Sequence, residues 1–194
     1  SGAIPEEGLI NRCKNALKDF SITNLSQLLQ CQLVDVKIGK QEKIPSLSAI
    51  IGINSFGSLL WPQNGDADVD VPVFLAGGTL DLITPPLKEQ LGLLISTKSN
   101  ALSRVLVVEG ASHFSPVRVE GQAQEDNGDD VFQLDAAIVG VKPLVVQKIY
   151  AREIIRFLEG LEASEQLGSS EHTNYGDIRS HLLDRKAINN LLKN

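Results

Sequence analysis

Two apolar runs that lack polar alternation constrain the fold of this chain more than any other feature. They are Val71–Ala76 and Arg104–Glu109, the second centred on four consecutive aliphatic residues. Strands with one wet face alternate apolar and polar residues, whereas nearly continuous apolar strands are typical of a parallel sheet covered on both faces. Between them we expect a helix from about Pro85 or Pro86 to Leu94, which completes a strand–helix–strand unit and predicts an α/β fold. The apolar face of this helix consists of Leu87, Leu91 and Leu94.

The preceding and following segments extend this unit. We expect residues 1–45 to be helical and irregular, and we interpret them as a helical insert or cap region. Residues 46–162 hold the sheet, with a first strand at Leu47–Asn54 and a long amphipathic helix from about Leu144 to Leu161. The expected apolar face of the long helix consists of Val145, Val146, Ile149, Tyr150, Ile154, Ile155, Leu158 and Leu161.

The C-terminal part, residues 163–194, is polar in composition. We expect a linker through Asp177 and a terminal helix over Ile178–Leu192. His172 and His181 fall in this polar tail, and the sequence predicts that both are solvated.

The charge balance limits the classes of partner. Lys and Arg number 18 against 24 Asp and Glu, which gives a formal net charge of −6. This argues against a nucleic acid or an anionic membrane surface as the main partner, because phosphate binding needs a basic face. No apolar run reaches the ~18 residues that a membrane-spanning helix needs. The acidic segment Arg118–Asp135 is interpreted as a solvated surface loop, because its carboxylates lack the regular alternation of an EF-hand.

The two cysteines leave an alternative open. Cys13 and Cys31 lie 18 positions apart, and two cysteines alone cannot form a structural zinc site. They fit either two buried thiols or one disulfide, which would contribute ~3 kcal/mol by closing a loop. A disulfide would imply an oxidising compartment, so the sequence is compatible with a cytoplasmic or an extracytoplasmic location.

Two polar side chains follow the buried strands at the points where those strands end. Asp81 comes after Val71–Ala76 and two glycines, and His113 comes after Arg104–Glu109 and a glycine-containing turn. The carboxyl ends of parallel strands form one rim, where open α/β sheets place their sites. A carboxylate beside an imidazole holds the ring tautomer and stabilises the imidazolium, while the other ring nitrogen acts as general base. The sequence therefore predicts a catalytic Asp81–His113 pair.

These motifs resemble the C-terminal half of the α/β-hydrolase fold. Val71–Pro85 is similar to the strand and turn that carry the acid, and Val105–Phe114 is similar to the strand and loop that carry the histidine. The Ile53-Asn54 turn and the cysteine-containing stretch Cys13–Cys31 are similar to the predicted dienelactone-hydrolase-like group, which is related to platelet-activating-factor acetylhydrolases and common in cyanobacteria. The resemblance covers about residues 5–162. It implies a mostly parallel sheet flanked by helices, with a helical insert at the N-terminal end, and a serine hydrolase of carboxylic esters without a metal or organic cofactor.

The nucleophile of such a triad is expected on a Gly-x-Ser-x-Gly elbow, and these 194 residues contain no such pentapeptide. The nearest segment is Ile53–Gly57, which has Ile at the position of the first glycine and too short a connection to the next strand. Ser55 is therefore a weaker candidate. Because the chain contains no Met, we interpret Ser1 as a processed or engineered start and expect the elbow, the oxyanion hole and the first strands upstream of it.

Two functions follow from this sequence. In the first, Asp81 and His113 belong to a Ser-Asp-His triad that cleaves a small-molecule ester, and the chain alone is inactive. In the alternative, the chain is a non-catalytic hydrolase-like module that binds ligands or partners. In both cases the edge of Leu47–Asn54 is expected to pair with the missing N-terminal half or with a second copy, because unpaired strand edges recruit other strands.

Overall fold

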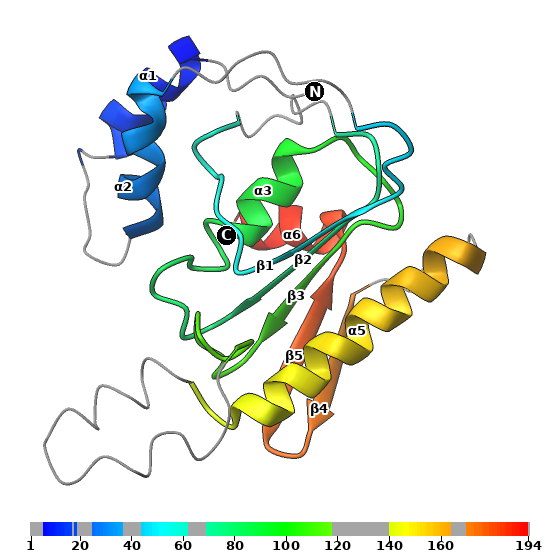
Figure 1. Ribbon diagram of the computed structural model, residues 1–194. Coiled ribbons are helices and arrows are strands. Elements are labelled where there is room, and N and C mark those ends of the chain that lie inside the picture. The colour runs from blue at the N-terminus through cyan, green and yellow to red at the C-terminus, as the bar shows by residue number, and fades with distance from the viewer. Residues whose placement is uncertain are drawn as a thin grey trace, which may run out of the picture.

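The computed structural model describes residues 6–16, 18, 25–36, 44–61, 69–117, 140–163 and 170–193. Figure 1 shows one sheet with helices on both of its faces. The strands are β1 (Ile50–Ile53), β2 (Val73–Gly78), β3 (Arg104–Val108), β4 (Glu171–Tyr175) and β5 (Ile178–Leu183). The helices are α1 (Glu6–Ala16), α2 (Leu25–Cys31), the 3-10 turn η1 (Gln32–Asp35), α3 (Gln90–Ser96), α5 (Pro143–Ala163) and α6 (Arg185–Leu191). The acidic segment Arg118–Asp135 lies outside the described residues.

The five strands form an open sheet in the order β1-β2-β3-β5-β4. Strands β1, β2 and β3 are parallel, with Ile53 opposite Ala76 and Gly78 opposite Val108. Strand β5 is antiparallel to both β3 and β4. The predicted α/β class with a mostly parallel sheet is thereby confirmed. None of the helices in the described part of the chain is long and apolar enough to span a membrane.

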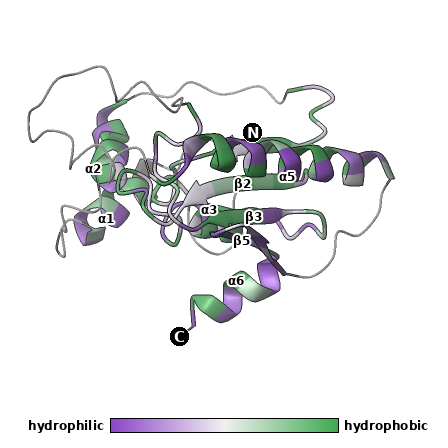
Figure 2. Ribbon diagram, turned by 90° about the horizontal axis from the view of Figure 1, so that it is seen from below, coloured by the Kyte–Doolittle hydropathy of each residue, from purple (hydrophilic) through white to green (hydrophobic). Residues whose placement is uncertain are grey.

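Helices cover the sheet on both faces, as the continuous apolar runs predicted (Figure 2). Every residue of β2 and β3 is buried. On one face, Phe74 and Leu106 pack with Ile149 and Phe157 of α5, and the Phe74 and Phe157 ring centroids are 5.3 Å apart. The opposite face packs against α3 and α6 through Leu75, Val105, Leu91, Leu94 and Ile188.

Two expected helix faces need correction. Helix α3 begins at Gln90 rather than at Pro85 or Pro86, because turns occupy the intervening residues, and Leu87 is 62% exposed. In α5, Ile155 and Leu158 are exposed, whereas Phe157 is buried although the expected apolar face omitted it. A helix on a sheet buries only the stripe that faces the strands, and the α5 sequence is apolar beyond that stripe.

The expected linker and terminal helix are largely replaced by a β-hairpin. Strands β4 and β5 occupy the segment up to Leu183, and only α6 lies where a terminal helix was predicted. From Ile178 to Leu182, buried residues alternate with the less buried Arg179 and His181, which is the period of a strand. The hairpin satisfies the backbone groups of β3 that would otherwise form the sheet edge.

The N-terminal insert consists of α1, α2 and η1, and the structure answers the question that the cysteines left open. Cys13 and Cys31 form a disulfide with 5.6 Å between their Cα atoms. The insert packs on the segment after β1, where Leu9 and Cys13 contact Leu59 and Leu60. It therefore covers one end of the domain, near the carboxyl end of β1 (Figure 1).

Candidate active site

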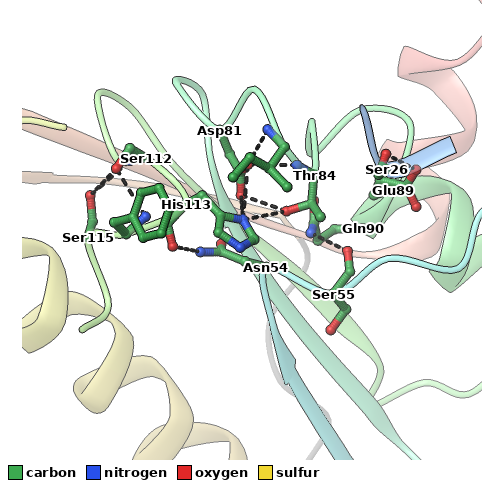
Figure 3. A network of polar contacts seen from close by, with 12 residues as sticks. Ser26, Asn54, Ser55, Asp81, Thr84, Glu89, Gln90, Ser112, His113 and Ser115 are labelled. Atoms are coloured by element: carbon green, nitrogen blue, oxygen red, sulfur yellow. Dashed lines mark hydrogen bonds and ion pairs between the residues drawn. The ribbon is translucent and has the colours of Figure 1, made fainter. Parts of the chain in front are cut away.

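The loops after β2 and β3 are joined by backbone hydrogen bonds. The N–H of Thr79 donates to the Val108 carbonyl at 3.1 Å, and the N–H of Leu80 donates to the Ala111 carbonyl at 2.9 Å. Gly78 permits this approach, because a Cβ at that position would lie 2.1 Å from the Ala111 carbonyl oxygen. The two loops consequently present Asp81 and His113 at one rim of the sheet (Figure 3).

Asp81 is 2% exposed, and its carboxylate is satisfied by several donors. Oδ1 accepts from the N–H groups of Ile83 at 3.0 Å and Thr84 at 2.7 Å, and Oδ2 accepts from Thr84 Oγ1 at 2.6 Å. These bonds offset the desolvation of a buried charge and fix the orientation of the carboxylate.

The predicted Asp81–His113 contact is confirmed. His113 Nδ1 lies 3.0 Å from Asp81 Oδ2 and 3.2 Å from Oδ1, and it lies 3.1 Å from Thr84 Oγ1. The carboxylate accepts only, and the Thr84 hydroxyl proton is directed to Asp81, so Nδ1 of His113 carries the proton and donates to both groups. Nε2 is then the basic nitrogen. Within the described residues Nε2 has no hydrogen-bond partner, and the side chain is 29% exposed.

Two further residues hold His113, and the sequence analysis did not assign either of them to the site. Thr84 belongs to an Asp-x-x-Thr turn, a local pattern that could have indicated its bond to Asp81. Asn54 follows β1 with a φ of 50°, and its Nδ2 donates to the His113 carbonyl at 2.7 Å. Asn54 thereby links the end of β1 to the loop after β3, a contact between segments 59 residues apart.

Helix α5 contributes Tyr150 to the surroundings of Asp81. Tyr150 is 3% exposed, and burial, followed by the negative charge of Asp81, raises its pKa above the ordinary value for a phenol. Its hydroxyl has no partner among the described residues. Tyr150 is therefore a neutral group beside the carboxylate and does not compensate its charge.

The structure does not bring Ser55 to His113. The Ser55 carbonyl accepts from Gln90 Nε2 at 2.8 Å, and its Oγ lies against β1, only 2.2 Å from the point that a Cβ on Gly52 would occupy. No hydrogen bond joins Ser55 to the His113 ring in the part of the chain that the structure describes. Among those same residues, no group of three or more His, Cys, Asp or Glu side chains could hold a metal ion.

Strand β1 lies at an open edge of the sheet, beside this rim. Ile51 and Ile53 are each 39% exposed, and an apolar hollow of about 270 Å³ adjoins the strand, lined in part by Phe56, Trp61 and Leu93. Three buried side-chain atoms near this edge have no partner among the described residues: Asn54 Oδ1, Gln90 Oε1 and Trp61 Nε1. Buried polar atoms are rarely left unpaired, which makes these three atoms unusual within the described part of the chain.

Comparison with known proteins adds no family to this geometry. The chain matches no family model, no curated protein and no solved structure. The interpretation of the site rests on the arrangement of its own residues.

Proposed function

We propose that this chain supplies the acid and the base of a Ser-Asp-His triad, in a serine hydrolase that acts on carboxylic esters. The observation that carries the proposal is the His113 ring. Its Nδ1 is held by the buried Asp81 carboxylate, while Nε2 has no hydrogen-bond partner among the residues that the structure describes, and the side chain is partly exposed at the carboxyl ends of parallel strands. This is the arrangement that a general base needs, because the ring is oriented and the accepting nitrogen is accessible.

The proposed reaction uses each group in turn. Nε2 of His113 takes the proton of a serine hydroxyl as its oxygen attacks the ester carbonyl, and Asp81 stabilises the imidazolium that forms. His113 then gives this proton to the leaving alkoxide, which departs as the alcohol and leaves an acyl-enzyme. Water attacks the acyl-enzyme by the same proton transfers, which releases the carboxylic acid and restores the serine.

We place the nucleophile on a strand that pairs in parallel with the open edge of β1. A parallel neighbour of β1 would end at the same rim as β2 and β3, which is where a serine must lie to reach His113. Three features support this placement: β1 is the outermost strand of the described sheet, Ile51 and Ile53 are exposed, and Asn54 Oδ1 has no partner in the described part of the chain. A second copy of the chain is the other occupant that this edge would accept.

The alternative function is a non-catalytic hydrolase-like module that binds ligands or partners. One observation favours it: none of the described hydroxyl groups bonds to Nε2 of His113. In this alternative the Asp81–His113 pair stabilises the two loops and performs no proton transfer.

A fluorophosphonate probe applied to the product of the complete reading frame separates the two functions. We expect covalent labelling of one serine, and we expect the His113→Gln variant to lose at least about a thousandfold in labelling rate. Labelling at an unchanged rate in that variant, or no reactive serine, would favour the binding module. The 194-residue chain by itself should not hydrolyse a nitrophenyl ester; turnover that Ser55→Ala abolishes would instead assign Ser55 as the nucleophile.

The placement at β1 has a separate test. The 194-residue chain is expected to associate at micromolar concentration by light scattering, and Ile51→Lys should weaken that association. Ile155→Lys is the matched control, because Ile155 is an exposed isoleucine on α5, away from β1. A monomer with a cooperative melt, or equal effects of the two variants, would contradict the placement.

A further inference from the structure

The β4–β5 hairpin brings together two histidines that the proposed hydrolase does not use. His172 of β4 is directly opposite His181 of β5, and their Nδ1 atoms are 2.7 Å apart. His172 is exposed, and the His181 side chain is 23% exposed. The prediction that both are solvated holds for the exposed His172, whereas most of the His181 side chain is covered, and strand pairing places the two rings in contact.

A carboxylate fixes the tautomer of the inner histidine. His181 Nε2 lies 2.7 Å from Glu109 Oε1, and a carboxylate only accepts, so Nε2 carries the proton. Nδ1 of neutral His181 then carries a lone pair that faces His172. This lone pair accepts a hydrogen bond from the Nδ1–H of His172. Metal-binding histidines characteristically donate their second ring N–H to a carboxylate in this way, which orients the ring and raises its basicity.

The spacing of the two nitrogens fits a transition-metal ion. Two nitrogens bonded to one metal at about 2.0–2.1 Å are about 2.8–3.0 Å apart as neighbours in a square-planar site and about 3.3–3.4 Å apart in a tetrahedral one. The observed 2.7 Å is the length of the hydrogen bond between the two rings, so an ion that replaces the shared proton would need the nitrogens to move apart by about 0.1–0.3 Å in a square-planar site, which Cu²⁺ and Ni²⁺ favour, and by about 0.6–0.7 Å in a tetrahedral one. Small rotations of the rings would direct both lone pairs to one point, and the exposed position of His172 leaves room for them.

The other cysteine and histidine side chains of this sequence offer few competing sulfur or nitrogen ligands. Both cysteines are in the disulfide, so no thiolate is available to a soft metal. The third histidine, His113, has its Nδ1 bound to Asp81 and offers one nitrogen. The sequence has three histidines, and two of them, His172 and His181, are in contact in the hairpin.

We propose that His172 and His181 form a two-histidine site for a divalent transition-metal cation, with Glu109 orienting His181 and water completing the coordination. The expected order of affinity is Cu²⁺ above Ni²⁺ and Zn²⁺, from the general stability order and the nitrogen spacing. Binding moves the His172 proton from Nδ1 to Nε2, or releases one proton when His172 is charged. The bound ion joins the outermost strand β4 to β5 and so stabilises the hairpin.

Isothermal titration of the tag-free chain with CuCl₂, NiCl₂ or ZnCl₂ tests the site. We expect one ion per chain and a rise in melting temperature with metal concentration. Glu109→Gln should weaken binding by about 10–100-fold, and His172→Ala, which removes a ligand, should weaken it at least as much. Asn174→Ala is the control, because Asn174 is an exposed polar residue of the same strand that is outside the pair.

Each outcome of this titration bears on the proposal. Loss of binding in His172→Ala and in His181→Ala, with Asn174→Ala unchanged, supports the site. Binding that persists in both histidine variants and disappears in His113→Ala would overturn it, as would no heat and no melting shift with millimolar metal. Ring ¹⁵N signals of His172 and His181 that fail to respond to diamagnetic Zn²⁺ would also contradict the assignment.

Discussion

Asp81 and Glu89 are two buried carboxylates in neighbouring segments, and they bind different kinds of donor. Glu89 is fully buried and accepts from Ser26 Oγ at 2.7 Å, from Gln30 Nε2 at 3.1 Å and from the backbone N–H of Gly57 at 2.9 Å. Both the N–H and the hydroxyl of Ser58 also donate to it. Asp81 accepts from its own turn and from the ring of His113.

The difference indicates which carboxylate can take part in chemistry. Among the described residues, the donors to Glu89 are all neutral and belong to α2 and to the segment after β1, so Glu89 links the insert to the sheet. Asp81 instead faces the imidazole ring of His113, whose side chain is partly exposed. Burial of a carboxylate is therefore not by itself the mark of a reactive site; the nature of its partner is.

The largest expected effect is on reactivity, in Asp81→Asn. The amide would donate to Nδ1 of His113, so the ring proton would move to Nε2, which could then no longer accept the proton of a serine. We expect fluorophosphonate labelling of the complete protein to slow about 10⁴-fold. Denaturant unfolding should change by only about 1 kcal/mol, because the new amide can keep most of the hydrogen bonds.

The ring tautomer can also be measured in the 194-residue chain alone. The ¹⁵N spectrum of His113 should show a protonated Nδ1 in the wild type and a protonated Nε2 in Asp81→Asn. If the tautomer of His113 is the same in both proteins, Asp81 does not control the ring proton, and this difference between Asp81 and Glu89 is contradicted.

The corresponding substitutions of Glu89 are expected to lower the free energy of unfolding. Glu89→Ala leaves several buried donors without an acceptor, and we expect it to lower the free energy of unfolding by about 3–5 kcal/mol. Glu89→Gln keeps one acceptor oxygen and should lower it by about 1–3 kcal/mol. Urea unfolding of both variants measures these values. A larger loss of stability in Asp81→Asn than in Glu89→Gln would contradict the expectation that Glu89, rather than Asp81, stabilises the fold.

The disulfide should stabilise the same insert that Glu89 fastens. Replacing Cys13 and Cys31 by Ser is expected to lower the free energy of unfolding by about 3 kcal/mol, since the bond closes a loop with a separation of 18 residues. Hydrogen exchange should accelerate in α1 and α2 before it accelerates in β2 and β3. Equal acceleration in the insert and the sheet would show that the insert does not open separately.

The smallest expected effect is that of Tyr150→Phe, beside Asp81. The hydroxyl has no partner among the described residues, so its removal should change stability at pH 7 by less than about 1 kcal/mol. The raised pKa of Tyr150 means that the unfolded chain loses the phenol proton first, so wild-type stability falls as the pH rises above the ordinary value of 10.0. The Phe variant should lack this part of the fall in unfolding curves measured from pH 9 to 11. A parallel pH dependence in both proteins would contradict the raised pKa.

Much of the central sheet could be predicted because the relevant information is local. The apolar runs within β2 and β3 require cover on both faces wherever they occur, and the glycines and polar residues that follow mark the strand ends. Two parallel neighbours then bring their ends to one rim, so Asp81 and His113 could be paired before any coordinates were known. The hydrogen bond from Thr84 to Asp81 was not predicted, although the Asp-x-x-Thr pattern is equally local. Turn residues after an aspartate are common, so this pattern by itself does not indicate a site.

The amino-acid sequence by itself determined the two covered strands and the positions of Asp81 and His113 after their ends, since these depend on the order of residues within short segments. Only the tertiary structure decided which secondary structure the polar C-terminal part adopts and which donors bind the buried Glu89. A segment with weak alternation becomes β5 because β3 presents a free edge to it, and His181 meets Glu109 across 72 residues of chain. Which edge is free, and which donors surround a carboxylate, are properties of the assembled sheet and insert, so no single segment could have predicted them.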